Sequence, residues 1–587
     1  MRKHLFTVIF LLCSTTGFGQ NIRVTILHVN DVYQFAPVDG GKRGGLARLL
    51  TLKKEAVAAN PNTIFTLGGD TLSPSVETRT YKGAQMIDAW NAVGIDYAVF
   101  GNHEFDIKTV ELLARINESK FTWLGANVID VKTKKIFANT PPYVIREIGG
   151  VKIGFIGLVL PETKQTSSME DNLTVTDYCA TAKKLVREMR VQKKVNAVIG
   201  LTHLFMAQDK KLATCADFDL ILGGHEHALL QSSSNGTPIF KMTADARELG
   251  KFNLNFNAKT KRLESFDWEI VPVTDAIADA PEFAPVYEKY RGLLEQLSVE
   301  IGATSIELDA LSHSNRQKET NIGNFVADAY RNAANADIGF VNGGSIRADL
   351  MYQPGPLTKR DVLSILPFNN PIVKIEVTGK LLKQILEHGV ARSGPGEDNE
   401  PGRFPQISGL RFEWDSSKPA GSRVVSVTVA GRPLDEAKTY TVATSDFLVS
   451  RGGDGYTMFT DGKRLTGAAT GPKDSDVLEA AIRNAPNSTI SPILDGRILR
   501  INWSALRRYL RCRCVTCFPL SGGGHALNRV FAGASSCTGF WAITGFHNYH
   551  STFRPHEKEF WWGKMPQVEN FTSFNAQYHS VKLFTIN

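Results

Sequence analysis

Five short hydrophobic segments in the first half of the chain are each followed, within a few residues, by a side chain that can bind a metal ion. The segments are Ile22–Val29, Thr63–Leu67, Tyr97–Phe100, Ala197–Leu201 and Leu220–Leu222. Short apolar runs bounded by glycine and polar residues are typical of buried strands. Ligands of open α/β sheets gather at the carboxyl ends of such strands. The chain is therefore expected to build a layered α/β domain around a polar site at one sheet edge.

The side chains at these strand ends are oxygen and nitrogen donors, which suit hard and borderline metal ions. They are Asp31, Asp70, Asn102 with His103, His203, and His225 with His227. A single histidine after a strand is usually a hydrogen-bonded structural residue. Five strand ends with such donors instead predict a two-metal centre, and the usual chemistry of such a centre is phosphoester hydrolysis.

The length of 587 residues exceeds what one hydrophobic core normally holds, so at least two domains are expected. Strand and helix patterns alternate over 21–272 and predict the first α/β domain. A polar, proline-containing stretch follows, and 273–301 is expected to form a linker that ends in a helix over Tyr287–Ile301. A second, smaller α/β domain is predicted over 302–501.

The first 19 residues have the pattern of a secretory signal peptide. Arg2 and Lys3 precede an apolar run over Leu5–Cys13 that is too short to span a bilayer, and Gly17 and Gly19 supply small residues near its end. A secreted or periplasmic location is therefore expected. No later segment reaches transmembrane length without charges, so no membrane span is predicted.

Two observations on cysteine refine this expectation. Leu12, rather than a small residue, precedes Cys13, which argues against a lipid anchor at that cysteine. Cys179 and Cys215 are the only cysteines of the main body. They could pair in an oxidising compartment or remain buried thiols, and the sequence leaves both options open.

Residues 502–587 differ in composition from the rest of the chain. They carry nine Lys and Arg against three Glu and no Asp, which accounts for most of the formal net charge of +8. The main body is close to neutral, so a nucleic-acid partner is not indicated. Cys512-x-Cys514-x2-Cys517 permits a zinc knuckle, but no second cysteine pair follows at zinc-ribbon or finger spacing. The favoured interpretation is a poorly ordered extension, or a stretch that was not selected for this fold, such as read-through or out-of-frame sequence, and no function is assigned to it.

Five ordered motifs resemble those of the calcineurin-like metallophosphoesterases. The motifs are ILHVNDVY (26–33), GGD (68–70), GNHEFD (101–106), LTH (201–203) and GGHEH (223–227). More narrowly, the chain is similar to secreted bacterial 5′-nucleotidases, including periplasmic UDP-sugar hydrolases, over about Ile22 to Ile501. The resemblance implies an N-terminal β-sandwich flanked by helices, joined by a helix to a smaller α/β 5′-nucleotidase C-terminal domain.

The resemblance also implies roles for the donor residues. Two divalent ions, Zn, Mn, Co or Mg, would share the carboxylate of Asp70, because a bridging anion offsets their mutual repulsion. One ion would also bind Asn102, His203 and His225, and the other would bind Asp31 and His227. The histidine of GNHEFD faces the phosphoryl group in this family, and the aspartate three residues later orients it. His103 and Asp106 match this catalytic pair.

One position departs from the family pattern. The first motif usually reads Asp-x-His, whereas here it reads Asp31-Val32-Tyr33. Tyr33 could coordinate a metal ion, could lie behind the ligands while water fills the gap, or could leave the first metal position weak. Phenolate binds strongly Lewis-acidic or trivalent ions, whereas a neutral phenol is a poor ligand.

The second domain is expected to bind the substrate. Asn342, Gly343, Gly344 and Arg347 follow a predicted strand, and in similar 5′-nucleotidases the matching arginine contacts the substrate phosphate. Arg392 is a further candidate contact or a solvated surface residue. The glycine-flanked loops that carry Phe404 and Tyr456 resemble those that hold the nucleobase between two rings, and Asp461 is a candidate partner of the ribose hydroxyls.

These observations predict a secreted two-metal phosphoesterase that converts nucleoside 5′-monophosphates into nucleoside and phosphate. UDP-sugars, 2′,3′-cyclic nucleotides or other phosphoesters are alternative substrates on the same fold, and a thiosulfate-ester hydrolase is a more remote one. The alternative from another class is a nucleotide-binding surface protein in which Tyr33 marks a decayed metal site. The sequence leaves the oligomeric state open.

Overall fold

The first domain contains two β-sheets with a common core. In the first sheet, β1, β2, β3 and β4 run parallel, and β13 and β14 continue it antiparallel beside β1. The strands are β1 (Ile22–Val29), β2 (Thr63–Leu67), β3 (Tyr97–Val99), β4 (Thr122–Leu124), β13 (Glu248–Phe256) and β14 (Leu263–Pro272). β1 is buried along most of its length, as expected of a parallel strand that is covered on both faces.

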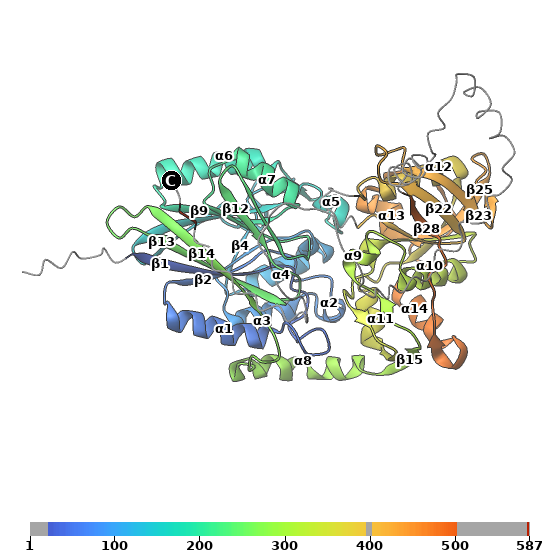
Figure 1. Cartoon of the computed structure of the whole chain (residues 1–587), viewed down its shortest axis with the longest axis horizontal. Coiled ribbons are helices and arrows are strands. Elements are labelled where there is room, and N and C mark those ends of the chain that lie inside the picture. The colour runs from blue at the N-terminus through green and yellow to red at the C-terminus, as the bar shows by residue number, and fades with distance from the viewer. Residues whose placement is uncertain (1–20, 395–401, 502–583, 586–587) are drawn as a thin grey trace, which may run out of the picture. The chain divides into compact units, whose positions relative to one another are not determined.

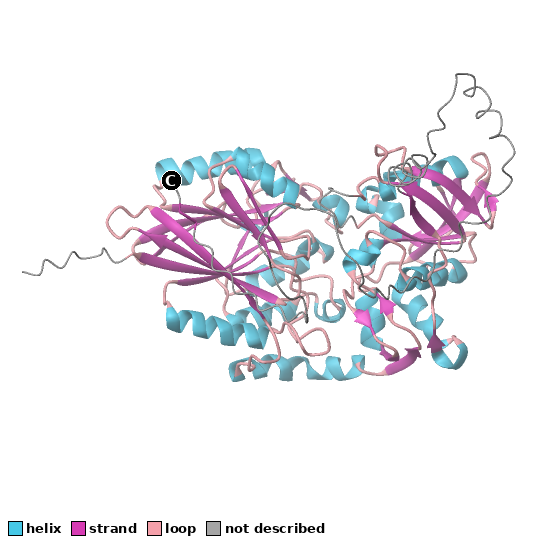
Figure 2. Ribbon diagram, in the orientation of Figure 1, coloured by secondary structure: helices cyan, strands magenta, loops and turns pink. Residues whose placement is uncertain are grey.

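The second sheet has the order β11-β12-β10-β9-β7-β6, with β7, β9, β10 and β12 parallel. Its strands are β6 (Val144–Ile148), β7 (Val151–Val159), β9 (Ala197–His203), β10 (Leu220–Gly223), β11 (Leu230–Ser234) and β12 (Thr237–Lys241). Residues of both sheets belong to one buried hydrophobic cluster. The two sheets therefore form the predicted sandwich (Figure 2).

Helices cover both outer faces of this sandwich. α1 (Leu46–Ala59) and α3 (Ala84–Val93) lie on the side of β2, whereas α6 (Tyr178–Arg187) and α7 (Met206–Cys215) lie on the side of β9 and β12 (Figure 1). A disulfide between Cys179 and Cys215 joins α6 to α7. The pairing that the sequence left open is thus formed.

A single helix, α8 (Ala284–Leu297), follows the linker. It begins and ends a few residues before the predicted helix over Tyr287–Ile301. The sequence placed Pro285 in the linker, but a proline in the first turn of a helix costs no hydrogen bond, because that N–H has no partner within the helix. The helix ends early because the chain enters β15 at Glu300.

The second domain has a mixed five-stranded sheet at its centre, in the order β21-β17-β25-β20-β26. These strands are β17 (Ile338–Asn342), β20 (Ile372–Thr378), β21 (Pro405–Ser408), β25 (Thr439–Ser445) and β26 (Lys463–Arg464). α10 (Asn321–Ala333) packs on β17 and β21, and α12 (Gly379–Val390) contacts β20 and β21. The N-terminus of α10 is capped by Thr320, whose hydroxyl accepts the N–H of Gly323.

Besides a two-stranded pair, β16 (Leu308–Asp309) with β18 (Met351–Tyr352), two smaller sheets complete this domain. One has the order β24-β23-β22-β28 and contains β22 (Leu410–Asp415), β23 (Val424–Val429), β24 (Arg432–Pro433) and β28 (Ile498–Ile501). The other is formed by β15 (Glu300–Thr304), β19 (Gly355–Thr358) and β27 (Thr489–Ile490), beside α14 (Asp474–Arg483). The expected mixed α/β architecture with two domains is confirmed.

These features come from a computed structural model that describes residues 21–394, 402–501 and 584–585 (Figure 1). The predicted signal peptide lies outside the described residues, as does the predicted tail except for β29 (Phe584–Thr585), which pairs with β14. Within the described residues, no helix has both the length and the apolar character that are needed to cross a bilayer.

Candidate metal centre and substrate cleft

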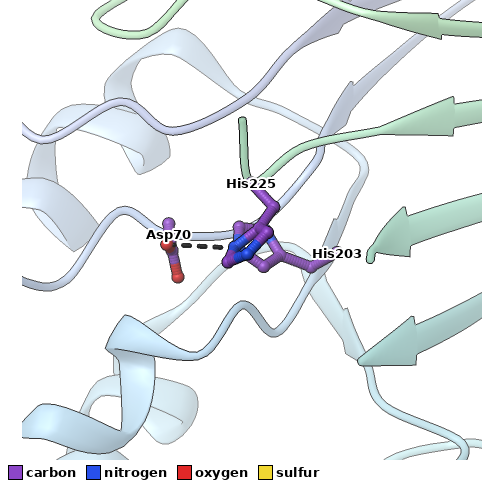
Figure 3. A group of neighbouring side chains, drawn as sticks. All are labelled: Asp70, His203 and His225. Atoms are coloured by element: carbon purple, nitrogen blue, oxygen red, sulfur yellow. Dashed lines mark ion pairs between the residues drawn. The ribbon is translucent and has the colours of Figure 1, made fainter. Parts of the chain in front are cut away.

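The strand ends of the two sheets bring one group of predicted metal ligands together. Asp70 follows β2, His203 ends β9 and His225 follows β10, and these three residues offer ligand atoms that all lie within 4.8 Å of one another (Figure 3). His203 Nε2 lies 3.1 Å from Asp70 Oδ2. Asn102 Oδ1, in the same cleft, is buried and has no hydrogen-bond partner among the described residues. A buried acceptor without a partner is costly, so this oxygen fits a metal ligand.

A hydrogen bond orients the His203 ring toward Asp70. His203 Nδ1 lies 2.8 Å from the carbonyl oxygen of Gly68, which favours a proton on Nδ1 and leaves Nε2 toward Asp70. Burial lowers the pKa of His203, but the Asp70 carboxylate outweighs this effect and raises it to about 10. Burial also lowers the pKa of His225 well below its usual value. A cation between Asp70 and His203 would replace the proton that otherwise neutralises the carboxylate.

A second group of donors lies beside Asp70. Asp31 Oδ1 lies 3.3 Å from His227 Nε2. The hydroxyl of Tyr33 lies 2.8 Å from His227 Nε2, 3.3 Å from Asp31 Oδ1 and 3.4 Å from Asp70 Oδ2. The structure therefore brings all six predicted ligands and Tyr33 to the same sheet edge, as two groups that meet at Asp70.

The backbone at these positions is unusual. Asp31, Asp70, His225 and His227 all have positive φ, between 53° and 95°. Residues other than glycine rarely adopt this conformation, and it concentrates at functional sites because it carries a conformational cost. Each of these sharp turns redirects the chain at the strand end and points a side chain into the site.

His103 and Asp106 lie together in the cleft. His103 Nδ1 is 2.7 Å from Asp106 Oδ2. Asp106 also accepts hydrogen bonds from the Ser73 hydroxyl, at 3.0 Å, and from the backbone N–H of Ser168, at 3.1 Å. The backbone N–H of His103 donates to Asp70 Oδ1 at 2.7 Å. The carboxylate of Asp106 thus fixes the imidazole, and two further donors fix the carboxylate.

Sequence reasoning missed a layer of buried charged residues behind the ligands. Glu104 accepts hydrogen bonds from the backbone N–H groups of Asp70, Thr71, Leu72 and Gly101, and burial raises its pKa to about 7. This carboxyl group ties the Asp70 loop to the Asn102 loop. Its place inside the GNHEFD motif was the available signal.

A second cluster of this kind supports the loop that carries His225 and His227. Lys241 Nζ lies 2.9 Å from Asp209 Oδ2, donates to the carbonyl oxygen of Leu204 at 2.5 Å, and contacts Glu226. All of these side chains are buried. Glu226 stands between the two histidines in sequence, which is the only sequence signal for it.

Arg347 of the second domain reaches the metal ligands. Its Nη2 atom donates to the Tyr33 hydroxyl at 2.9 Å and lies 3.5 Å from His227 Nε2. Arg347 also faces the ring of Phe368, at 5.9 Å from the ring centroid. Arg392 lies 4.6 Å above the ring of Phe205, which itself packs against His225. Both predicted arginines therefore line the cleft beside the metal ligands.

The cleft has a volume of about 260 Å³ and is lined by residues of both domains. Asn342 and Gly344 belong to its lining, and the Asn342 amide donates to Asp454 Oδ2 at 2.6 Å. The backbone N–H groups of Gly343 and Gly344, two residues of the predicted substrate-binding loop, donate to the carbonyl oxygens of Phe404 and Gly402, at 2.7 and 2.8 Å.

The predicted ring clamp is not present in the structure. Phe404 and Tyr456 are fully buried in a hydrophobic cluster of the second domain, and neither lines the cleft. Phe404 directly precedes β21 and packs near Trp414, whereas Tyr456 packs against Phe340 and donates its hydroxyl to the carbonyl oxygen of Arg403. A large apolar ring beside a central strand gains more from core burial than from an exposed position.

Asp461 is also remote from the cleft. It is exposed at the end of a short 3-10 helix, Thr457–Asp461, and does not contribute to the cleft lining. Other rings occupy the cleft. Phe205, Phe368 and Phe447 line it, and none of them was singled out from the sequence.

Comparisons with known proteins agree with this architecture. Residues 24–229 match the calcineurin-like phosphoesterase family, and residues 300–461 match the 5′-nucleotidase C-terminal domain. The chain is 30% identical over 529 residues to the trifunctional nucleotide phosphoesterase protein YfkN of Bacillus subtilis; this covers 81% of the chain and 35% of that protein. It is 28% identical to human 5′-nucleotidase, covering 81% of the chain and 90% of that protein.

A solved structure gives the same result. The crystal structure of the 5′-nucleotidase precursor from Thermus thermophilus superposes with a TM-score of 0.75 at 28% identity, and covers 82% of this chain and 99% of that one. The chain belongs to the family that joins a calcineurin-like phosphoesterase domain to a 5′-nucleotidase C-terminal domain. It is a metal-dependent phosphoric monoester hydrolase.

Proposed function

We propose that the chain hydrolyses nucleoside 5′-monophosphates to nucleoside and phosphate, with two metal ions at the edge of the sandwich. The observation that carries this proposal is the meeting of two donor groups at Asp70, with Arg347 in contact with Tyr33 and His227 beside them. One group offers Asn102, His203 and His225, and the other offers Asp31 and His227. Bound ions supply Lewis acidity toward the phosphoryl oxygens and activate water at neutral pH.

The side chains around the centre then have separate tasks. Arg347 offers a planar, permanently charged fork suited to a phosphate group, and it is already directed at the metal ligands. His103, oriented by Asp106, protonates the leaving oxygen of the nucleoside or stabilises charge on the transferred phosphoryl group. The ring of Phe368 lies beside the His103 ring, with 5.6 Å between the ring centroids.

The nucleoside occupies the side of the cleft that the second domain provides. Asn342, Gly344, Arg392 and Phe447 of that domain line the cleft. Phe404 and Tyr456 have no role in this proposal, since their rings belong to the core. UDP-sugars and cyclic nucleotides remain alternative substrates, because the same groups would bind the phosphate of each.

A secreted or periplasmic location is part of the proposal. The disulfide between Cys179 and Cys215 supports it, because such bonds persist in oxidising compartments and are rare in the cytosol.

The test is phosphate release from a panel of nucleotides by metal-stripped protein that is resupplied with Mn, Zn, Co or Mg. The proposal expects turnover of nucleoside 5′-monophosphates with at least one of these ions, and loss of turnover in Asp70→Asn. Nucleotide binding without turnover under every metal condition would instead support the non-catalytic alternative.

A further inference from the structure

Arg247, the residue before strand β13, contacts three aspartates. Its Nε and Nη2 atoms donate to the two carboxylate oxygens of Asp39, at 3.1 and 3.0 Å. Its Nη1 atom lies 3.7 Å from Asp245 Oδ2 and 3.6 Å from Asp349 Oδ2. The bidentate pairing with Asp39 fixes the plane of the guanidinium group, because two parallel hydrogen bonds allow only one orientation. The remaining edge of the group is thereby held beside Asp245 and Asp349.

Asp245 connects Arg247 to the metal-binding edge of the first domain. Asp245 Oδ1 accepts the backbone N–H of Tyr33 at 3.0 Å. The backbone N–H of Asp245 donates to the carbonyl oxygen of Asp31 at 2.9 Å. The Asp245 side chain is buried, and a buried carboxylate requires a compensating charge. Arg247 supplies such a charge and so stabilises the residue that anchors Tyr33.

Asp349 connects the same guanidinium group to the second domain. Arg247 Nη2 donates to the backbone carbonyl oxygen of Asp349 at 3.4 Å, in addition to the contact with its carboxylate. The Oδ1 atom of Asp349 accepts the backbone N–H of Ser312 at 2.9 Å. Asp349 follows Arg347 by two residues, which span at most about 7 Å. A shift of Asp349 is therefore passed on to the backbone of Arg347.

These contacts form a closed cycle around the arginine to which the proposed function assigns the phosphate. Arg347 Nη2 donates to the Tyr33 hydroxyl at 2.9 Å. Tyr33 is anchored by Asp245, which lies beside Arg247. Arg247 in turn holds Asp349, from which the chain leads back to Arg347. The cycle contains residues of both domains, so it fixes the metal-binding edge and the phosphate-binding arginine relative to each other.

The guanidinium group of Arg347 has few other restraints. Among the described residues, no carboxylate forms an ion pair with it; it lies 5.2 and 5.9 Å from the ring centroids of Tyr33 and Phe368. Contacts between a cation and a ring fix orientation less strictly than a bidentate ion pair. The backbone N–H of Arg347 donates to the carbonyl oxygen of Ile365 at 3.0 Å, a bond within the second domain. Contacts of the Arg347 loop with the first domain must therefore place the group relative to the metal ligands.

We propose that Arg247 is a positioning residue for phosphoester hydrolysis, which places the Arg347 guanidinium group relative to the metal-binding edge. Arg247 does not line the cleft, so it acts through Arg347. The inference rests on the phosphate-binding role that the proposed function gives to Arg347. A misplacement of about 1 Å in a substrate-binding group can lower a rate by a factor of about a hundred.

The test measures kcat/KM of the metal-loaded full chain with p-nitrophenyl phosphate, a phosphate monoester that lacks a nucleoside. Arg247→Ala should lower kcat/KM by roughly tenfold to a hundredfold at unchanged metal content. In an Arg347→Ala background, the same substitution should cause a further loss of no more than about twofold, because the group that Arg247 positions is already absent. Arg247→Lys should recover part of the activity, because an ammonium group can pair with an aspartate but cannot form the bidentate contact.

Arg190→Ala is the matched control. Arg190 also lies beside two carboxylates, at 2.6 Å from Asp219 and 3.3 Å from Asp217, and donates to the carbonyl oxygen of Asp217 at 3.0 Å. It belongs to the first domain and does not line the cleft. This variant should keep the wild-type kcat/KM, which would show that loss of a partly buried arginine is not sufficient to lower activity.

Asp349→Asn is the second variant and carries the test alone if Arg247→Ala fails to fold. Asp349 has a φ of 51°, which asparagine tolerates, and the amide oxygen can still accept the N–H of Ser312. Only the charge that faces Arg247 is lost. Asp349→Asn should therefore lower kcat/KM in the wild-type background and have little effect in Arg347→Ala.

Three results would overturn the inference. They are wild-type kcat/KM in both Arg247→Ala and Asp349→Asn, a loss of the same size with and without Arg347, and a loss that is explained by lower metal content. Full activity in Arg347→Ala would instead contradict the role that the proposed function gives to Arg347. Cleavage of p-nitrophenyl phosphate without turnover of nucleoside 5′-monophosphates would contradict only the proposed substrate, so the two ideas can fail separately.

Discussion

At the scale of single residues, the site depends on hydrogen bonds that hold catalytic candidates in place. Ser73 is an example that no sequence pattern singles out. Its hydroxyl shares Asp106 Oδ2 with His103 Nδ1, so it orients the carboxylate that orients the imidazole. Ser73 is therefore a positioning residue. Its loss should lower activity mainly with substrates whose leaving group His103 must protonate.

Replacement of Ser73 by Ala should lower kcat for a nucleoside 5′-monophosphate by roughly tenfold, the cost of one hydrogen bond to a charged group. The loss should be much smaller with p-nitrophenyl phosphate, because its leaving group needs little protonation. The measurement is kcat for both substrates at equal bound metal. Ser426→Ala, which removes a serine–carboxylate bond of 2.9 Å to Glu413 on an exposed surface, is the control. Equal losses on both substrates would contradict the positioning role.

The predicted metal-binding residues share a simple origin in the sequence. Each of these residues lies at or just after the end of a short apolar strand: Asp31, Asp70, Asn102, His203 and His225. Parallel strands bring their ends to one edge of the sheet regardless of the loop sequences. Phe404 and Tyr456 were predicted from loop motifs alone. An aromatic ring suits a hydrophobic core as well as a ligand cleft, and only the packing of the second domain decides between the two.

At the scale of elements, strand positions followed from hydrophobic patterns while some boundaries did not. β1 and β2 have the predicted bounds. α8 begins before its predicted start because Pro285 fits its first turn. Glu104 and Lys241 were missed because their importance lies in burial and in contacts from distant strands, which no local pattern reveals.

The start of α14 carries a buried acid. Asp474 accepts the backbone N–H groups of Asn370 and Ser475, at 3.1 and 2.7 Å. Burial raises the pKa of Asp474 from 3.8 to about 7. The folded protein therefore binds the proton more tightly than the unfolded chain does. Stability from this group is full below about pH 4 and is lost as the pH rises toward 7.

Asp474→Asn should remove this pH dependence. Between pH 4 and pH 7 the free energy of unfolding should fall less in the variant than in the wild type. The two decreases should differ by at most about 4 kcal/mol. Denaturant unfolding at several pH values gives the measurement. Asp476→Asn alters an exposed acid in the same helical turn and should retain the wild-type slope. An unchanged slope in Asp474→Asn would show that the buried acid does not titrate in this range.

At the scale of the whole molecule, ion pairs connect the two domains around the cleft. Arg360 of the second domain lies 3.1 Å from Glu77 of the first, and Arg247 lies 3.6 Å from Asp349. The side chain of Glu77 is only 5% exposed. Removal of the partner of a buried carboxylate is strongly destabilising. A variant that breaks this ion pair therefore tests whether the two domains are in contact in solution.

Arg360→Ala should lower the free energy of unfolding by about 3 kcal/mol, because it leaves Glu77 buried and unpaired. Adding Glu77→Gln should recover part of this loss, because the neutral amide costs less to bury. Chemical denaturation of the wild type, both single variants and the double variant completes the cycle. Additive effects of the two substitutions would contradict the contact.

Two donor groups meet at Asp70, and we propose that together they hold two metal ions. The number of metal ions per chain can be measured by mass spectrometry of the native protein after it has been loaded with metal and dialysed. We expect two ions in the wild type and loss of at least one, together with activity, in Asp70→Asn. A folded wild-type chain that holds no metal, or an Asp70→Asn variant with two ions and full phosphate release, would contradict this proposal.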